Sequence, residues 1–183
     1  PCEPACRRGR VEEPPVAICR LKRVAADFKD DVKHRMPKPL AKNGKRIALV
    51  GGGPASLTVA RDLAPLGYHC TVFDADPRAG GMMRSQIPKF RLPDSVIDEE
   101  TDYILNLGVD FKGGHRIDSL KKLMAENYDA IFIGSGAPRG RELDIPGRKE
   151  AAANIHSAIE ALASVPFGHV EKIGRRVIVL GGG

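Results

Sequence analysis

The feature that most constrains this chain is a short apolar run followed directly by three glycines, in residues 45–56 (KRIALVGGGPAS). The run at 47–50 is too short for a helix and has no polar alternation, which is typical of a strand buried on both faces of a parallel sheet. After the glycines, Pro54 suits the first turn of a helix, and an apolar helical stripe continues until Gly67 can end it. The sequence therefore predicts a strand, a glycine turn and a helix in that order.

The glycine turn fits the pattern GxGxxG, with Gly51 and Gly53 in the first two slots and the small residue Ser56 in the third. Gly51 permits a tight turn, Gly53 lets a pyrophosphate approach the backbone, and the helix N-terminus offers N–H groups to the phosphates. A second predicted strand, at 68–74, ends in Asp74, 18 residues after Ser56. That spacing is close to the offset of about 20 residues at which a carboxylate binds the ribose hydroxyls. The pattern predicts a dinucleotide site at this turn.

The elements that follow predict an α/β fold. Gly80 and Gly81 indicate a second place where the backbone lies close to a ligand. A helix should begin at a capping Asp94 and end at Gly108, and a strand should follow at 109–111. A second helix, capped by Asp118 or Ser119, and a buried strand at 130–133 come next. Because strands alternate with helices, we expect a doubly wound parallel sheet, that is, a Rossmann-like domain.

Composition and charge narrow the classes of function. The 183 residues are 42% hydrophobic, enough for a real core. No apolar run reaches the roughly 18 residues of a membrane helix and no signal peptide opens the chain, so we expect a soluble, cytoplasmic protein without a membrane partner.

The positive charge is concentrated at the start of the chain. Residues 1–46 hold 13 Lys/Arg against 6 Asp/Glu, and the remainder holds 16 against 17. This basic arm has only one aromatic residue, so a solvated face or an acidic protein partner is favoured over nucleic acid.

The four cysteines lie in three different contexts. Cys2 and Cys6 open the chain in PCEPAC, and two thiolates are too few for a cluster, so spacing alone leaves free thiols and ligands open. Cys70 lies in the second predicted strand and should be a buried thiol. Cys19 lies at the start of a predicted helix, and we expect its thiol to be packed against other residues as well. A linker at 37–44 follows that helix. The apolar face of that helix consists of Ile18, Leu21, Val24, Ala25, Phe28 and Val32.

The end of the chain repeats its central motif. Residues 176–183 read RVIVLGGG and residues 46–53 read RIALVGGG, 130 positions earlier. The repeat predicts the first strand and glycine turn of a second dinucleotide-binding unit. The chain reads as a fragment cut at both ends.

The whole chain resembles the family of the small (beta) subunit of NADPH-dependent glutamate synthase. The same module occurs in the N-terminal part of dihydropyrimidine dehydrogenase and in subunits attached to formate dehydrogenases. The matching motifs, in family order and spacing, are PCEPAC, ALVGGGPAS, VFDADPRAGGM, IPKFRLP, YDAIFIGSGA, DIPG and VIVLGGG. The resemblance implies an oxidoreductase subunit that passes electrons from NADPH through FAD to 4Fe-4S clusters and a larger partner subunit or domain.

The resemblance also implies a division of the chain and a set of site residues. Residues 1–36 would end a helical iron–sulfur domain, 45–174 would form the FAD-binding domain after the linker, and 175–183 would begin an NADPH-binding domain. The implied metal ligands are Cys2 and Cys6, the last two of a set serving two 4Fe-4S clusters. The implied FAD contacts are Gly51, Gly52, Gly53, Pro54 and Ala55 for the pyrophosphate, Asp74 for the ribose, Gly80, Gly81 and Met82 for the flavin nucleotide, Arg91 for the cofactor, and Ile117 for the adenine. The family acid at position 74 is usually Glu.

Two other functions remain open. A plain NAD-binding dehydrogenase domain would need only Gly51, Gly53 and Asp74, but it leaves the second glycine pair and the second GGG unexplained. A cofactor-free module could tether a larger assembly through its basic N-terminal arm. No side chain is an evident catalytic acid or base, and the five histidines show no ligand spacing, so we expect the redox chemistry to belong to the cofactors.

Overall fold

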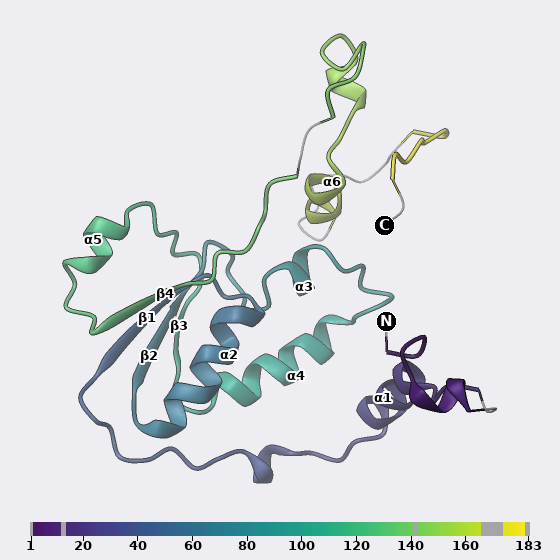
Figure 1. The fold of residues 1–183 in the computed structure, drawn as a ribbon. Coiled ribbons are helices and arrows are strands. Elements are labelled where there is room, and N and C mark those ends of the chain that lie inside the picture. The colour runs from purple at the N-terminus through teal and green to yellow at the C-terminus, as the bar shows by residue number, and fades with distance from the viewer. Residues whose placement is uncertain (1, 12–13, 141–142, 166–173, 182–183) are drawn as a thin grey trace. The chain divides into compact units, whose positions relative to one another are not determined.

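The computed structural model describes residues 2–11, 14–140, 143–165 and 174–181. The chain divides into two compact units, Pro1–Met36 and Pro37–Gly183. The second unit holds the sheet (Figure 1). It also holds the first glycine turn, at residues 51–53, and the pair Gly80–Gly81, which is called the second glycine turn below.

The sheet has four strands, all parallel, in the order β3-β2-β1-β4. Their bounds are β1 Arg46–Val50, β2 His69–Phe73, β3 Asp110–Lys112 and β4 Ala130–Ile133. The register sets Leu49 of β1 beside Val72 of β2 and Phe132 of β4. Leu49 and Val72 are completely buried, as expected for a central parallel strand pair covered on both faces. The predicted doubly wound α/β fold is confirmed.

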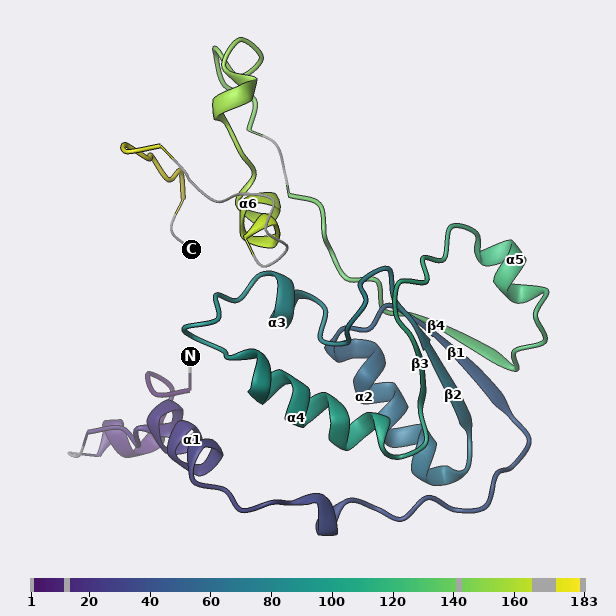
Figure 2. The same cartoon turned by 180° about the vertical axis from the view of Figure 1, so that it is seen from behind.

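Helices cover both faces of this sheet. Helices α2 (Pro54–Leu63) and α4 (Asp94–Leu105) lie on one face and the short α5 (Leu120–Met124) lies on the other (Figures 1 and 2). Beneath α5, Leu123 packs with Ala48 and Phe73. The remaining helices are α1 (Ile18–Asp27), α3 (Met82–Ser85), α6 (Ala158–Ser164) and the 3-10 turns Arg7–Arg10, Lys33–Arg35, Ala64–Leu66 and Ala152–Asn154.

The predicted element ends are close, with small corrections. Gly67 has a φ of +87° and ends its helical segment as predicted. Helix α4 ends earlier than predicted, at Leu105 with Asn106 as its C-cap, and Gly108, with a φ of +86°, lies in the turn that follows. The strand predicted at 109–111 lies one residue later, at Asp110–Lys112. Asp94 is the first helical residue rather than the cap, because Pro93 holds the extended cap position. Ser119 is the cap of α5, and its Oγ accepts the Lys122 N–H at 3.4 Å.

The helix of the N-terminal unit departs further from expectation. Helix α1 ends at Asp27, before Val32, and Asp31 instead accepts the Lys33 N–H in a tight turn. The described part of α1 contains no buried residue, and Cys19 is exposed, so its predicted packing is wrong. Cys70 is buried as predicted.

The predicted terminal strand does not form over residues 176–181. A strand needs a hydrogen-bonded neighbour, and none of the described strands pairs with this segment. Gly182 and Gly183 of the repeated glycine turn lie outside the described residues. None of the described helices has the length and apolar character needed to cross a membrane.

Candidate functional site

The first glycine turn, at residues 51–53, and the second, at Gly80–Gly81, meet at the carboxyl ends of β1 and β2. The Gly80 N–H donates to the Gly52 carbonyl at 2.9 Å. A Cβ added to Gly81 would lie 2.8 Å from the Gly53 Cα. The turns therefore touch backbone to backbone, at the edge where open parallel sheets bind their ligands.

The three glycines of the first turn have different surroundings. At Gly51, φ is +101° and a Cβ would lie 2.4 Å from the Gly134 carbonyl oxygen. At Gly52, a Cβ would lie 2.6 Å from Asp74 Oδ2. At Gly53, φ is −82° and a Cβ would meet, among the described residues, only the Gly81 Cα at 3.9 Å. The fold itself excludes side chains at the first two positions, whereas the third faces open space.

Helix α2 begins at this open space. Gly53 is its N-cap and Pro54 its first residue, so the amides of Ala55 and Ser56 lie in the first turn. First-turn amides have no acceptor within their own helix, and they carry the positive end of the helix dipole. Within the described residues no side chain caps this end. The turn and the helix thus form a cradle for an anionic group.

Asp74 joins the glycine turn to the end of β2. Its Oδ2 accepts the Gly52 N–H, and its Oδ1 accepts the Asp76 N–H at 2.9 Å. Each carboxylate oxygen has a further lone pair, so hydroxyl donors can still bind. Burial, followed by the charge of Asp74, raises the pKa of the Asp76 carboxyl.

The other predicted cofactor contacts lie at different distances from the cradle. Met82 directly follows the second glycine turn and is 40% exposed. Ile117 is half-buried against the cluster under α5. Just before it, His115 donates its N–H to the Asp74 carbonyl at 2.7 Å, so this segment runs beside the acid. Arg91 is exposed, and the described hydrogen bonds join its backbone to Pro88 rather than to either glycine turn.

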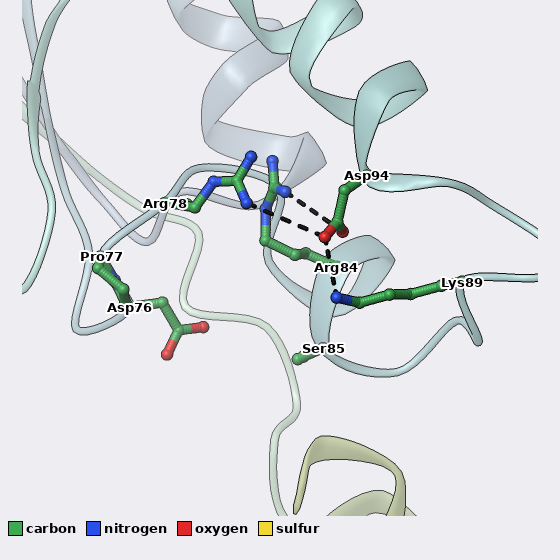
Figure 3. Close-up of a pocket in the computed structure, with 7 residues that line it drawn as sticks. All are labelled: Asp76, Pro77, Arg78, Arg84, Ser85, Lys89 and Asp94. Carbon is green, nitrogen blue, oxygen red and sulfur yellow. Dashed lines mark hydrogen bonds and ion pairs between the residues drawn. The ribbon is translucent and has the colours of Figure 1, made fainter. Parts of the chain in front are cut away.

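A group of charged residues near the turns was missed by the sequence analysis. A cavity of about 160 Å³ is lined by Asp76, Pro77, Arg78, Arg84, Ser85, Lys89 and Asp94 (Figure 3). Arg84 binds Asp98 at 2.7 Å, and Lys89 binds Asp94 at 3.1 Å. The one local signal was the spacing of Asp94 and Asp98, which places both carboxylates on one face of α4.

The two predicted metal ligands lie in the N-terminal unit. Cys2 is exposed and Cys6 is half-buried. Hydrogen bonds with the backbone of Val16, and then of Arg8, lower the pKa of the Cys6 thiol. A lowered pKa favours the thiolate, the form that binds metals. Over the described residues, the structure assembles no group of three or more His, Cys, Asp or Glu that could hold a metal ion.

The parallel sheet, the glycine turn before α2 and the acid at the end of β2 are the features of dinucleotide-binding α/β domains. The chain belongs to the pyridine nucleotide-disulphide oxidoreductase family, whose model matches residues 45–183. The solved structure of FprA from Mycobacterium tuberculosis (His57Gln mutant) has the same fold, with a TM-score of 0.57 at 22% identity over 66% of this chain and 28% of that one.

Curated relatives match the chain over its whole length. It is 35% identical to the NADPH-Fe(3+) oxidoreductase subunit beta of Geobacter sulfurreducens and covers 28% of that protein. It is 34% identical to the small chain of NADPH glutamate synthase from Mycobacterium tuberculosis, covering 40%. It is 33% identical to the NAD-dependent dihydropyrimidine dehydrogenase subunit PreT homolog of Salmonella typhi, covering 44% of that protein. The resemblance inferred from the motifs is confirmed, and the chain spans less than half of each relative.

Proposed function

We propose that this chain is the FAD-binding part of an oxidoreductase subunit that passes electrons from NADPH through FAD to 4Fe-4S clusters and a larger partner. The observation that carries the proposal is the open space in front of Gly53, where a Cβ would meet only the Gly81 Cα at 3.9 Å among the described residues. The relatives include an NADPH-Fe(3+) oxidoreductase subunit beta and an NADPH glutamate synthase small chain. Both names contain NADPH, which supports NADPH as the electron donor in the proposal.

The residues around the cradle fit an FAD pyrophosphate. The first-turn amides of Ala55 and Ser56 would donate to its oxygens, and Gly53 would let it approach the backbone. Asp74 would accept the ribose hydroxyls with the lone pairs that Gly52 and Asp76 leave free. Bound FAD would supply hydride acceptance and one-electron transfer, so the protein's part is to bind, orient and exclude water.

The iron–sulfur part of the proposal rests on the N-terminal unit. Cys2 and Cys6 would each ligate a 4Fe-4S cluster together with ligands from outside this chain. The lowered pKa of the Cys6 thiol supports a ligand role, because a cluster binds the thiolate. NADPH would bind to a further domain that begins at the repeated RVIVLGGG motif.

The absorbance spectrum of the full-length protein, before and after anaerobic addition of NADPH, tests this proposal. We expect flavin bands on a broad iron–sulfur shoulder, with both bleached by NADPH. A plain NAD-binding domain would lack the flavin bands, and a cofactor-free module would be colourless. Either of those two spectra would reject the proposed function.

A further inference from the structure

Arg84, on the short helix α3, is the most buried of the cations around the cavity. Its side chain is 12% exposed, compared with 51% for Arg78 and 59% for Lys89. Its Nε donates to the Ala79 carbonyl at 2.9 Å, and another guanidinium nitrogen binds Asp98 Oδ1 at 2.7 Å. One guanidinium therefore joins the loop before the second glycine turn to helix α4.

The second glycine turn lies directly against this guanidinium. A Cβ on Gly80 would lie 3.4 Å from Arg84 Nε and 2.9 Å from Ile97 Cγ2 of α4. On its other side, Gly80 donates its N–H to Gly52 of the first turn. The contacts thus run without a break from α4 through Arg84 and Gly80 to the first glycine turn.

Arg78 provides a natural comparison, because it binds the same two carboxylates from an exposed position. Figure 3 shows both guanidinium groups reaching Asp94, with Lys89 binding it from the other side. Arg78 also binds Asp98. The pKa of Asp98 is lowered chiefly by its hydrogen bond with Arg84 and less by the one with Arg78. Of the two arginines, only Arg84 also donates a hydrogen bond, among those of the described residues, to the Ala79 carbonyl just before the second glycine turn.

We propose that Arg84 is a positioning residue of the cofactor site, which anchors the Gly80–Gly81 turn to α4 and so keeps the two glycine turns in contact before FAD binds. A loop held in its binding conformation loses less conformational freedom when the ligand binds. The inference rests on the proposed function, since it concerns the affinity for FAD. It adds a residue outside the first glycine turn, linked to that turn through Gly80.

The test compares Arg84→Gln, Arg84→Lys and Arg78→Gln in the full-length protein. Two quantities are measured in each: the affinity of the apoprotein for FAD, from flavin fluorescence, and hydrogen exchange of the Gly80 amide. Arg84→Gln should weaken FAD binding about 10- to 100-fold, because it removes hydrogen bonds from a charged group, and should speed exchange at Gly80. Arg78→Gln should change the affinity less than about threefold, since exposed ion pairs contribute little.

Arg84→Lys separates positioning from simple folding. A lysine keeps the charge but lacks the planar fork that reaches Ala79 and Asp98 together, so it should recover only part of the affinity. Equal FAD affinity and equal Gly80 exchange in the unaltered protein and Arg84→Lys, or equal losses in Arg84→Gln and Arg78→Gln, would overturn the role of Arg84. Absence of FAD binding in the unaltered protein would instead overturn the proposed function.

Discussion

At the scale of single residues, the adjacent glycines of the first turn differ in why they are glycine. Gly51 has a positive φ and a carbonyl 2.4 Å from where its Cβ would lie. Gly52 is fixed by the Asp74 carboxylate, which accepts its N–H. Gly53 has an ordinary φ of −82° and space around it. Its lack of a side chain is therefore explained by a ligand better than by the fold.

Gly53→Val should accordingly separate folding from binding. Valine adopts a φ of −82° without strain but is a poorer N-cap residue than glycine, so the free energy of unfolding of the apoprotein should fall by only about 1 kcal/mol. The branched side chain would occupy the place of the pyrophosphate, and we expect a soluble but colourless protein. The measurement is flavin per chain after purification. Gly174→Val is the control, because among the described residues a Cβ there meets only the Arg176 carbonyl oxygen, at 3.8 Å. Full flavin occupancy in Gly53→Val would show that the turn does not hold the pyrophosphate.

Asp74→Ala should weaken FAD binding more than Asp76→Ala. Asp74 holds the Gly52 amide and would accept the ribose hydroxyls, whereas Asp76 only follows it in the loop. Hydrogen bonds to a charged group contribute about 1.5–3 kcal/mol, which corresponds to roughly 10- to 100-fold in affinity. Calorimetric titration of both apoproteins with FAD measures the difference. Equal affinities would mean that Asp74 is not the ribose ligand.

Asp76 also predicts a pH dependence of stability. Burial and Asp74 raise its folded-state pKa above the unfolded value, so the ionised form costs stability above the folded pKa, and the cost disappears as pH falls through that pKa. Asp76→Asn should therefore raise the Tm of the apoprotein by about 1–3 °C at neutral pH and by progressively less in acid. The check is a thermal melt series across pH. Asp102→Asn, at an exposed position of α4, should show no such gain. A gain that grows in acid would contradict the sign.

At the scale of elements, local signals in the sequence predicted most of the sheet. Apolar runs followed by glycines located β1 and β4. The predicted burial is right for β1, whose central residues are buried, and wrong for β4, an edge strand in which Ala130 and Ile133 are exposed and the two residues between them are half-buried. The apolar residues of α1 follow the helical period that the sequence predicted. Periodicity alone does not show whether another element packs on that face of the helix, and Leu21 and Phe28 are 56% and 83% exposed. The apolar run at 176–180 does not form a strand, because a strand must pair with a neighbouring strand and none of the described strands pairs with this segment.

The candidate site was predictable only where its residues belong to one local pattern. The first glycine turn and Asp74 follow the spacing of a strand–turn–helix–strand unit, and the structure brings them into contact. Arg84 and Asp98 are 14 residues apart on different helices, and no short-range rule pairs them. Their contact depends on how α3 and α4 pack, which is information that the sequence pattern does not carry.

The start of α2, where Ser56 lies against Gly134 just after β4, gives a prediction at this scale. Ser56 is completely buried, and its Oγ has no hydrogen-bond partner among the described residues. Ser56→Ala removes an unsatisfied hydroxyl and should raise the free energy of unfolding by up to about 1 kcal/mol. Ser119→Ala removes the cap of α5 and should lower it by about 0.5–2 kcal/mol. Urea unfolding of the apoproteins compares the two. A clear loss of stability in Ser56→Ala would reveal a partner for its Oγ.

At the scale of the whole molecule, the two compact units carry different candidate chemistry. Cys2 and Cys6 lie in Pro1–Met36, whereas both glycine turns and Asp74 lie in Pro37–Gly183. The family model covers the second unit from residue 45 onwards, and the curated relatives extend the similarity over the first. If iron–sulfur and flavin binding belong to separate units, substitutions should affect one without the other.

Cys2→Ser and Cys6→Ser in the full-length protein should therefore each lower iron per chain while leaving flavin per chain largely unchanged. Serine keeps the size of the side chain but removes the thiolate that a 4Fe-4S cluster requires. Cys19→Ser is the matched control, because Cys19 is an exposed thiol of the same unit outside the PCEPAC motif. Iron and flavin are measured on the same purified samples, so that misfolding would show as a parallel loss of both. Unchanged iron in both variants would remove the cluster assignment, and equal iron loss in Cys19→Ser would show that the PCEPAC cysteines have no special role.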